Sequence, residues 1–210
     1  MTTFDALALR RFVELFADRV HALRGELTEL DSAIGDADHG INMDRGFTAV
    51  RAKLAELDGE TDLGATAKTV GMTLISTVGG ASGPLYGTFF LRLATALGEQ
   101  TETDASGLGA ALRAGLEGVV QRGKANLDDK TMVDAMTPAV DAYDAAAAEG
   151  IDAALAAAAE AAATGRDRIT PLVARKGRAS YLGERSANHQ DPGATSTTVM
   201  FESLRDAVSD

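Results

Sequence analysis

Residues 30–46 read Leu-Asp-Ser-Ala-Ile-Gly-Asp-Ala-Asp-His-Gly-Ile-Asn-Met-Asp-Arg-Gly and connect two segments of helical pattern. The carboxylates of Asp31, Asp36 and Asp38 are separated by five and two positions, a spacing that places no three residues on one helix face. A loop can bring them together, and the neighbouring glycines give its backbone the necessary freedom. Converging carboxylates attract a hard cation such as Mg²⁺ or Ca²⁺, whereas the plain alternative is an acidic turn in an acidic protein. The stretch therefore predicts an interhelical loop that is either a metal site or a surface turn.

On both sides of this loop, apolar residues recur at intervals of three and four positions, which is the spacing of one helix face. The sequence lacks sustained alternation of apolar and polar residues, the pattern typical of strands. The predicted fold is an all-α, antiparallel bundle of about eight helices without a sheet, in one domain over residues 1–210. Gly25 is expected to end the first helix, and Pro138 to kink or interrupt the sixth. The predicted helices cover residues 4–24, 41–57, 63–78, 82–98, 108–123, 131–148, 151–163 and 194–208.

The chain is acidic, with 20 Lys and Arg against 31 Asp and Glu and a net charge of −11 at pH 7. This charge repels phosphate backbones and anionic lipids, which argues against nucleic-acid and membrane-surface binding. Because the sequence has no cysteine, disulfides, thiolate catalysis and zinc–sulfur sites are excluded. No segment approaches the roughly 18 uninterrupted apolar residues of a membrane span. We therefore expect a soluble cytoplasmic protein without nucleic-acid or membrane partners.

Two further junctions between predicted helices carry residues suited to phosphate. Residues 79–84, Gly-Gly-Ala-Ser-Gly-Pro, open a helix that Ser82 is expected to cap. Free N–H groups at such a helix start bind phosphate, although a flexible turn is the alternative. Residues 175–186 contain four basic side chains, which suit phosphate oxygens or merely balance acidic neighbours.

His39 and His189 each invite a role as general base, but a single histidine beside a turn is more often a structural hydrogen bonder. We expect that structural role for both. The acidic, glycine-rich and basic junctions together favour a Mg²⁺-dependent phosphate or nucleotide site on a helical bundle. This site is not a P-loop, because no Gly-Lys-Ser/Thr follows the glycines.

Four motifs resemble the dihydroxyacetone kinase L family in order and spacing, and the resemblance covers essentially the whole chain. The motifs are IGDADHGINM at residues 34–43, VGGASGPLYGTFF at 78–90, DKTM at 129–132 and GRASYLGERS at 177–186. The resemblance implies an eight-helix antiparallel barrel that binds ADP at one end through two Mg²⁺ ions.

The resemblance also implies roles for individual residues. Asp31, Asp36 and Asp38 would ligate the Mg²⁺ ions, and Arg178 would reach the phosphates as the catalytic residue. His39 then becomes a contact on the phosphate side of the nucleotide. The residues implied to bind the nucleotide are His39, Gly40, Ile41, Asn42, Gly80, Ala81, Ser82, Gly123, Met132, Arg178, Asp191, Pro192 and Gly193.

Two positions depart from the family pattern, because Asp128 and Asn188 stand where members often have glycine. Asn is tolerated at positive φ, so we expect the turn at residue 188 to be preserved. The form of the loop near Met132 is left open by Asp128.

The activity implied by the resemblance is that of a phosphotransferase subunit in glycerol metabolism, active only with partner subunits. A tightly held ADP/ATP would be recharged from phosphoenolpyruvate by a phosphocarrier M subunit, and its γ-phosphate would pass to dihydroxyacetone on a separate K subunit. One alternative is the nucleotide subunit of an ATP-dependent kinase of another ketose or sugar alcohol. Another is a nucleotide-loaded regulatory module that docks a transcription factor. A homodimer is expected, although the sequence leaves the oligomeric state open.

Overall fold

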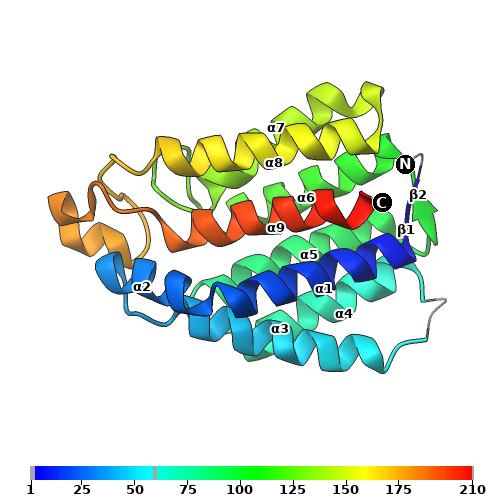
Figure 1. Ribbon diagram of the computed structural model, residues 1–210, viewed down its shortest axis with the longest axis horizontal. Helices are drawn as coiled ribbons and strands as arrows, with labels where there is room; N and C mark the ends of the chain where they lie inside the picture. The colour runs from blue at the N-terminus through cyan, green and yellow to red at the C-terminus, as the bar shows by residue number, and fades with distance from the viewer. Residues whose placement is uncertain (1–2, 59–60, 210) are drawn as a thin grey trace.

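Nine α-helices form within residues 3–58 and 61–209, the parts of the chain that the computed structural model describes (Figure 1). In chain order the elements are β1 (Phe4–Asp5), α1 (Ala6–Ala22), α2 (Arg24–Ile34), α3 (His39–Ala55), α4 (Leu63–Thr77), α5 (Ser82–Leu97), β2 (Glu102–Thr103), α6 (Ala105–Gly123), α7 (Val133–Ala146), η1 (Ala147–Glu149), α8 (Ile151–Arg168), η2 (Arg178–Ser186) and α9 (Pro192–Val208). The predicted all-α class is confirmed.

The long helices lie roughly parallel to the long axis of the molecule and alternate in direction (Figure 1). Helices adjacent in sequence pack against each other from α3 to α9, and α1 closes the bundle by packing against α9, α3 and α4. The two short strands lie at one end, whereas α2 and the 3₁₀ helix η2 lie at the opposite end (Figure 1). Because the helices alternate in direction, every second junction falls at the end that holds α2.

Aromatic side chains join α1 to its neighbours in the core. The ring of Phe16 meets that of Phe47 edge-on, with 4.5 Å between centroids, and lies 6.1 Å from the ring of Tyr86. Phe12 stacks against Phe90 at 6.1 Å. All five side chains are buried. Such pairs add about 0.5–1.5 kcal/mol each beyond the burial of their area, so α1 is fixed against α3 and α5.

Aspartates begin four of the helices. Asp5, Asp62, Asp104 and Asp191 each accept a hydrogen bond from the backbone N–H three residues later, at 2.6–2.8 Å. Each cap of this kind typically contributes about 1 kcal/mol to stability. In the described part of the chain, no helix is both long enough and apolar enough to cross a membrane.

The prediction that Gly25 ends the first helix is wrong. α1 ends at Ala22, and Gly25 lies in the first turn of α2, where an added Cβ would meet no neighbouring atom. The buried positions of α2 are Leu27, Asp31 and Ile34, which follow helical spacing. The apolar pattern missed this helix because a carboxylate occupies the middle position of its buried face.

The prediction of a fold without a sheet is also wrong in detail. Phe4 pairs with Thr103, and Asp5 with Glu102, in a two-stranded antiparallel ladder. Pro138 does not interrupt α7, which runs continuously from Val133 to Ala146. The neighbouring helix α8 accommodates the proline ring at Gly165, where an added Cβ would lie 2.8 Å from Cγ of Pro138.

Glycines allow α4 and α5 to approach closely, and this contact can be tested. A Cβ on Gly71 would lie 2.8 Å from the carbonyl oxygen of Gly87 and 2.9 Å from Cγ of Leu91. We predict that Gly71→Ala lowers the free energy of unfolding by about 1–3 kcal/mol, because overpacking outweighs the gain of about 1 kcal/mol in helix propensity. Urea denaturation followed by circular dichroism measures the change. The control Gly25→Ala should be neutral or stabilising, and equal effects of the two substitutions would contradict the prediction.

Candidate functional site

A cavity of about 440 Å³ lies at the end of the bundle that holds α2. Residues from four places in the chain line it: the α2–α3, α4–α5 and α6–α7 junctions, and the region from Lys176 to the start of α9. These include the acidic, glycine-rich and basic junctions that the sequence singled out. They meet because successive helices of an antiparallel bundle return the chain to the same end.

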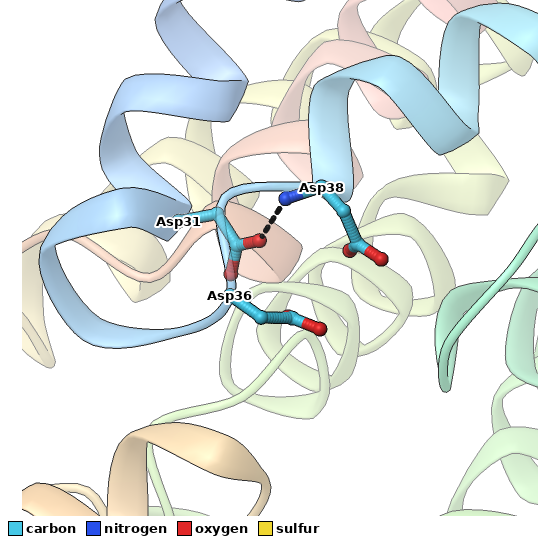
Figure 2. A group of neighbouring side chains, drawn as sticks. All are labelled: Asp31, Asp36 and Asp38. Atoms are coloured by element: carbon cyan, nitrogen blue, oxygen red, sulfur yellow. Dashed lines mark hydrogen bonds between the residues drawn. The ribbon is translucent and has the colours of Figure 1, made fainter.

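The carboxylates of Asp31, Asp36 and Asp38 face one another at this cavity (Figure 2). One oxygen from each residue lies within 4.8 Å of the other two. Oδ2 of Asp31 also accepts the backbone N–H of Asp38 at 2.8 Å and that of His39 at 3.1 Å. A group of three carboxylates at this separation could hold a hard divalent cation such as Mg²⁺.

The three carboxylates converge as predicted, but the loop carries only two of them. Asp31 belongs to the last turn of α2, and the turn that follows spans residues 35–38. Gly35 is required there, because a Cβ at this position would overlap the carboxylate of Asp31. Ala37 adopts a left-handed backbone with φ of 61°, which turns the chain sharply between Asp36 and Asp38.

Arg178 lies beside this carboxylate group. Its Nε is 3.0 Å from Oδ2 of Asp36, and 67% of its side chain is exposed. Lys176 and Arg122 also line the cavity. These three basic side chains therefore lie at this cavity, although the chain as a whole has a net charge of −11. A guanidinium in this place could contact an anion held next to the carboxylates, with two parallel hydrogen bonds.

His39 is buried and hydrogen-bonded on both sides of its ring. Nε2 lies 2.9 Å from Oγ of Ser196, and Nδ1 lies 3.0 Å from Oγ of Ser82. Burial lowers the pKa of His39 to about 4, although the nearby carboxylates of Asp31 and Asp38 raise it. The imidazole is therefore neutral at pH 7, and these bonds agree with the structural role that the sequence favoured.

The glycine-rich junction lies at the start of α5. Gly79, Gly80 and Ala81 line the cavity, and Gly80 has a φ of 65°. Ser82 also lines it, but the prediction that Ser82 caps the helix is wrong. The cap position is Ala81, which makes no side-chain hydrogen bond, and the Ser82 hydroxyl is directed to His39. The backbone N–H groups at this helix start could bind phosphate.

A buried carboxylate organises the α6–α7 junction from within. Asp134 accepts the backbone N–H of Asp128 at 2.5 Å and that of Thr131 at 2.8 Å. Burial raises the pKa of Asp134, whereas these hydrogen bonds lower it. Asp128 has a φ of 69° and Asn188 a φ of 63°, so both occupy the left-handed region that favours glycine. The expected turn at Asn188 is confirmed, and the Asp128 loop, which the sequence left open, adopts the same kind of backbone.

Asp191 caps α9 from inside the protein. Its Oδ2 accepts the backbone N–H of Ala194 at 2.7 Å, and the residue lines the cavity together with Pro192 and Gly193. Burial raises the pKa of Asp191 to about 7, and the opposite charge of Lys130 works against this rise. Burial thus favours the protonated carboxyl group of Asp191 more than it would for an aspartate in water.

The cavity includes most of the residues that the resemblance assigned to the nucleotide: His39, Asn42, Gly80, Ala81, Ser82, Gly123, Met132, Arg178, Asp191, Pro192 and Gly193. Two assigned residues lie outside its lining. Gly40 packs against α2, where a Cβ would overlap the carbonyl oxygen of Arg24, and the side chain of Ile41 is half-exposed on the surface. His189 is exposed and also lies outside the lining.

Sequence reasoning missed two kinds of residue at the cavity. Leu85, Val119 and Val133 form apolar wall, but their helical spacing is the same as that of core residues, so nothing in the sequence distinguished them. Lys130 was part of the DKTM motif without receiving a role. The position of Lys130 inside this motif was the sequence feature that could have indicated a role for it.

Comparison with known proteins identifies the family of the chain. The DAK2 domain matches residues 33–206 of the chain. The chain belongs to the DAK2 domain family. Within the family, it is 48% identical over 180 residues to the ADP-binding subunit DhaL of the PEP-dependent dihydroxyacetone kinase of Escherichia coli (strain K12), covering 85% of each chain. It is 43% identical over 204 residues to the corresponding subunit of kinase 1 of Listeria innocua, covering 96% of each.

Solved structures of the family have the same fold. The dihydroxyacetone kinase of C. freundii in its native form superposes with a TM-score of 0.74 at 28% identity, over 96% of this chain and 34% of that one. The same kinase in complex with AMP-PNP and Mg²⁺ gives a TM-score of 0.72 at 27% identity. This chain therefore spans about a third of the C. freundii kinase.

The burial of Asp191 predicts a pH dependence. When the pKa of an acid is higher in the folded chain than in the unfolded chain, the free energy of unfolding falls as the pH rises from the lower pKa to the higher one. From about pH 4 to pH 7, the folded chain retains a proton on Asp191 that the unfolded chain has released. Asp191→Asn keeps a capping oxygen but cannot ionise. The free energy of unfolding of the variant, relative to that of the parent, should therefore increase as the pH rises through this range. Urea denaturation at several pH values tests this, with Asp62→Asn as a control at a cap outside the cavity; a difference independent of pH would contradict it.

Proposed function

We propose that this chain is the nucleotide-binding subunit of a phosphoenolpyruvate-dependent dihydroxyacetone kinase, holding Mg²⁺ and ADP or ATP as a retained cofactor. The observation that carries this proposal is the cavity at which three carboxylates, a glycine-rich helix start and Arg178 meet. Two relatives named as ADP-binding subunits of this kind of kinase align over 85% and 96% of their own length. A structural neighbour is described in complex with AMP-PNP and Mg²⁺.

The acidic end of the cavity fits Mg²⁺. Asp31, Asp36 and Asp38 supply only carboxylate oxygens, the hard ligands that this ion prefers, and they lie close enough to share ions. We assign these three residues as ligands of two Mg²⁺ ions. The ions would neutralise charge on phosphate oxygens.

The remaining walls fit the other parts of a nucleotide. Backbone N–H groups at the start of α5 would bind the phosphates, since a helix start combines free donors with a positive dipole. Leu85, Val119 and Met132 would enclose the base in an apolar environment. Arg178 is the proposed catalytic residue, because its guanidinium would stabilise charge on the phosphoryl group during transfer.

The partners in this proposal are other subunits. Dihydroxyacetone would bind to a separate K subunit, and a phosphocarrier M subunit would recharge the nucleotide from phosphoenolpyruvate in the cytoplasm. A relative of this chain in Lactococcus lactis, 39% identical, is named an ADP-binding subunit of a PTS-dependent dihydroxyacetone kinase. The homodimer and the transcriptional regulator expected from the resemblance stay predictions.

Erythrulose is the competing substrate. Two erythrulose kinases of Mycolicibacterium smegmatis are 32% and 34% identical to this chain, but the chain spans only 34% of each. The relatives that align over most of their own length are named for dihydroxyacetone. We therefore propose dihydroxyacetone as the substrate.

The metal assignment yields a direct test of nucleotide binding. Asp36→Asn should weaken Mg²⁺-dependent ADP binding by at least about 100-fold, because a ligand contributes more than the outer residues whose loss costs 10- to 100-fold. Isothermal titration calorimetry with and without Mg²⁺ measures this. Asp44→Asn is the matched control, since Asp44 lies on α3 near His21 and Arg24, outside the cavity lining. ADP binding that is indifferent to Mg²⁺ and to Asp36→Asn would rule out the site.

Reconstitution tests the activity itself. The chain is combined with candidate K and phosphocarrier subunits, and phosphate is followed from phosphoenolpyruvate or from free ATP into dihydroxyacetone or erythrulose. Transfer to dihydroxyacetone that requires the phosphocarrier supports the proposal. Multiple turnovers with free ATP and no phosphocarrier would instead favour an ordinary ATP-dependent kinase.

A further inference from the structure

Lys130 is a buried lysine at the edge of the cavity, only 1% exposed. Its Nζ donates hydrogen bonds to three backbone carbonyl oxygens: those of Thr170 at 2.8 Å, Leu172 at 2.8 Å and Ser186 at 2.6 Å. An ammonium group has three N–H donors, so these carbonyls use its whole capacity. Because all its donors are used, the Lys130 ammonium can affect the site only through the backbone segments to which it is bonded.

The three carbonyls belong to the two ends of one segment. Residues 170–186, here called the cover segment, follow α8, line the cavity through residues 176–179 and end with η2, which carries Arg178. Thr170 and Leu172 lie at its beginning and Ser186 at its end. The ammonium of Lys130 therefore ties together the base of the cover segment.

The apolar contacts of the cover segment lie in two small clusters apart from the main core, and in one of them Leu172 packs against Ala135, Ile169 and Ala194. Ala174 and Ala179, with Leu182, pack against Ile34 at the end of α2 in a cluster separate from the main core. The fully buried members that the cover segment contributes to this cluster are the two alanines, which bury little apolar area. Polar ties complete the base: the Ala174 N–H donates to Oγ of Ser186 at 2.8 Å, and the Arg175 N–H donates to the Asp129 carbonyl at 3.0 Å.

We propose that Lys130 is a positioning residue for Arg178: by joining the ends of the cover segment, it holds the guanidinium beside Asp36 and over the cavity. Without this tie, the ends of the segment separate and the loop gains conformational freedom that must be lost again for each productive contact. The inference rests on the proposed function, because that function gives Arg178 its phosphate contact. The alternative is a lysine that merely supports folding.

Trypsin tests the tie without any nucleotide, because Arg175, Lys176, Arg178 and Arg185 are cleavage sites inside the cover segment. In Lys130→Met, a side chain of similar length without donors replaces the ammonium, and cleavage within residues 170–186 should become at least about tenfold faster while cooperative thermal unfolding is retained. Lys124→Met is the matched control. Lys124 lies in the same junction with a left-handed backbone, φ 50° against 64° for Lys130, but it is exposed. Its rate of cleavage within residues 170–186 should equal that of the parent.

Calorimetry of Mg²⁺-ADP binding then tests whether the tie acts through Arg178. Lys130→Met and Arg178→Ala should each weaken binding about 10- to 100-fold, and the double variant should be no weaker than the weaker single variant. Additive losses, unchanged cleavage, or faster cleavage with unchanged affinity would overturn the positioning role and leave the proposed function standing. A parent chain that binds no Mg²⁺-ADP would instead remove the proposed function, and the positioning role with it.

A second variant guards against loss of the fold. If Lys130→Met no longer unfolds cooperatively, Lys130→Gln replaces it, because an amide has only two N–H donors for the three carbonyls and places no apolar chain among them. It should also speed cleavage of the cover segment and weaken Mg²⁺-ADP binding. Unchanged cleavage and affinity in Lys130→Gln would overturn the proposal.

Discussion

The site depends first on the carboxylate of Asp31, which accepts two backbone N–H groups at the start of α3 while it faces Asp36 and Asp38. The positive end of a helix dipole and two hydrogen bonds stabilise the negative charge of this group. The same bonds hold the turn between α2 and α3, which carries the other two carboxylates. Asp31 thus both holds the turn in place and supplies one of the three negative charges of the site.

The bundle separates an apolar body from a polar end. Aromatic and aliphatic side chains fill the middle, whereas Asp31, His39, Lys130, Asp134 and Asp191 are all buried near the cavity. Each has hydrogen-bond partners that offset part of the cost of removing it from water. The apolar middle of the bundle supplies most of the stability. The polar residues near the cavity position the groups that line it.

Hydroxyl groups connect this polar end to the body. Tyr86 lies 2.7 Å from Oγ of Ser196, which in turn contacts His39, and His39 contacts Ser82. The chain of bonds joins α5, α9 and α3 around a neutral imidazole. Burial raises the pKa of Tyr86 to about 12, so this phenol also stays neutral. An uncharged network of this kind can orient the cavity wall without adding charge to a site already dominated by carboxylates.

The sequence by itself determined the helical class, most helix positions and three of the four junctions, because 3.6-residue periodicity and glycine-rich breaks are local properties. It also determined the family, through motifs whose residues are read directly. Only the tertiary structure decided that Asp31 lies in the last turn of a helix and that Ile41 is exposed. Only it showed that the Ser82 hydroxyl is hydrogen-bonded to His39 and does not cap a helix. Only it assigned three carbonyl partners to Lys130. These outcomes depend on contacts between residues many positions apart, and no local pattern encodes which helix ends meet.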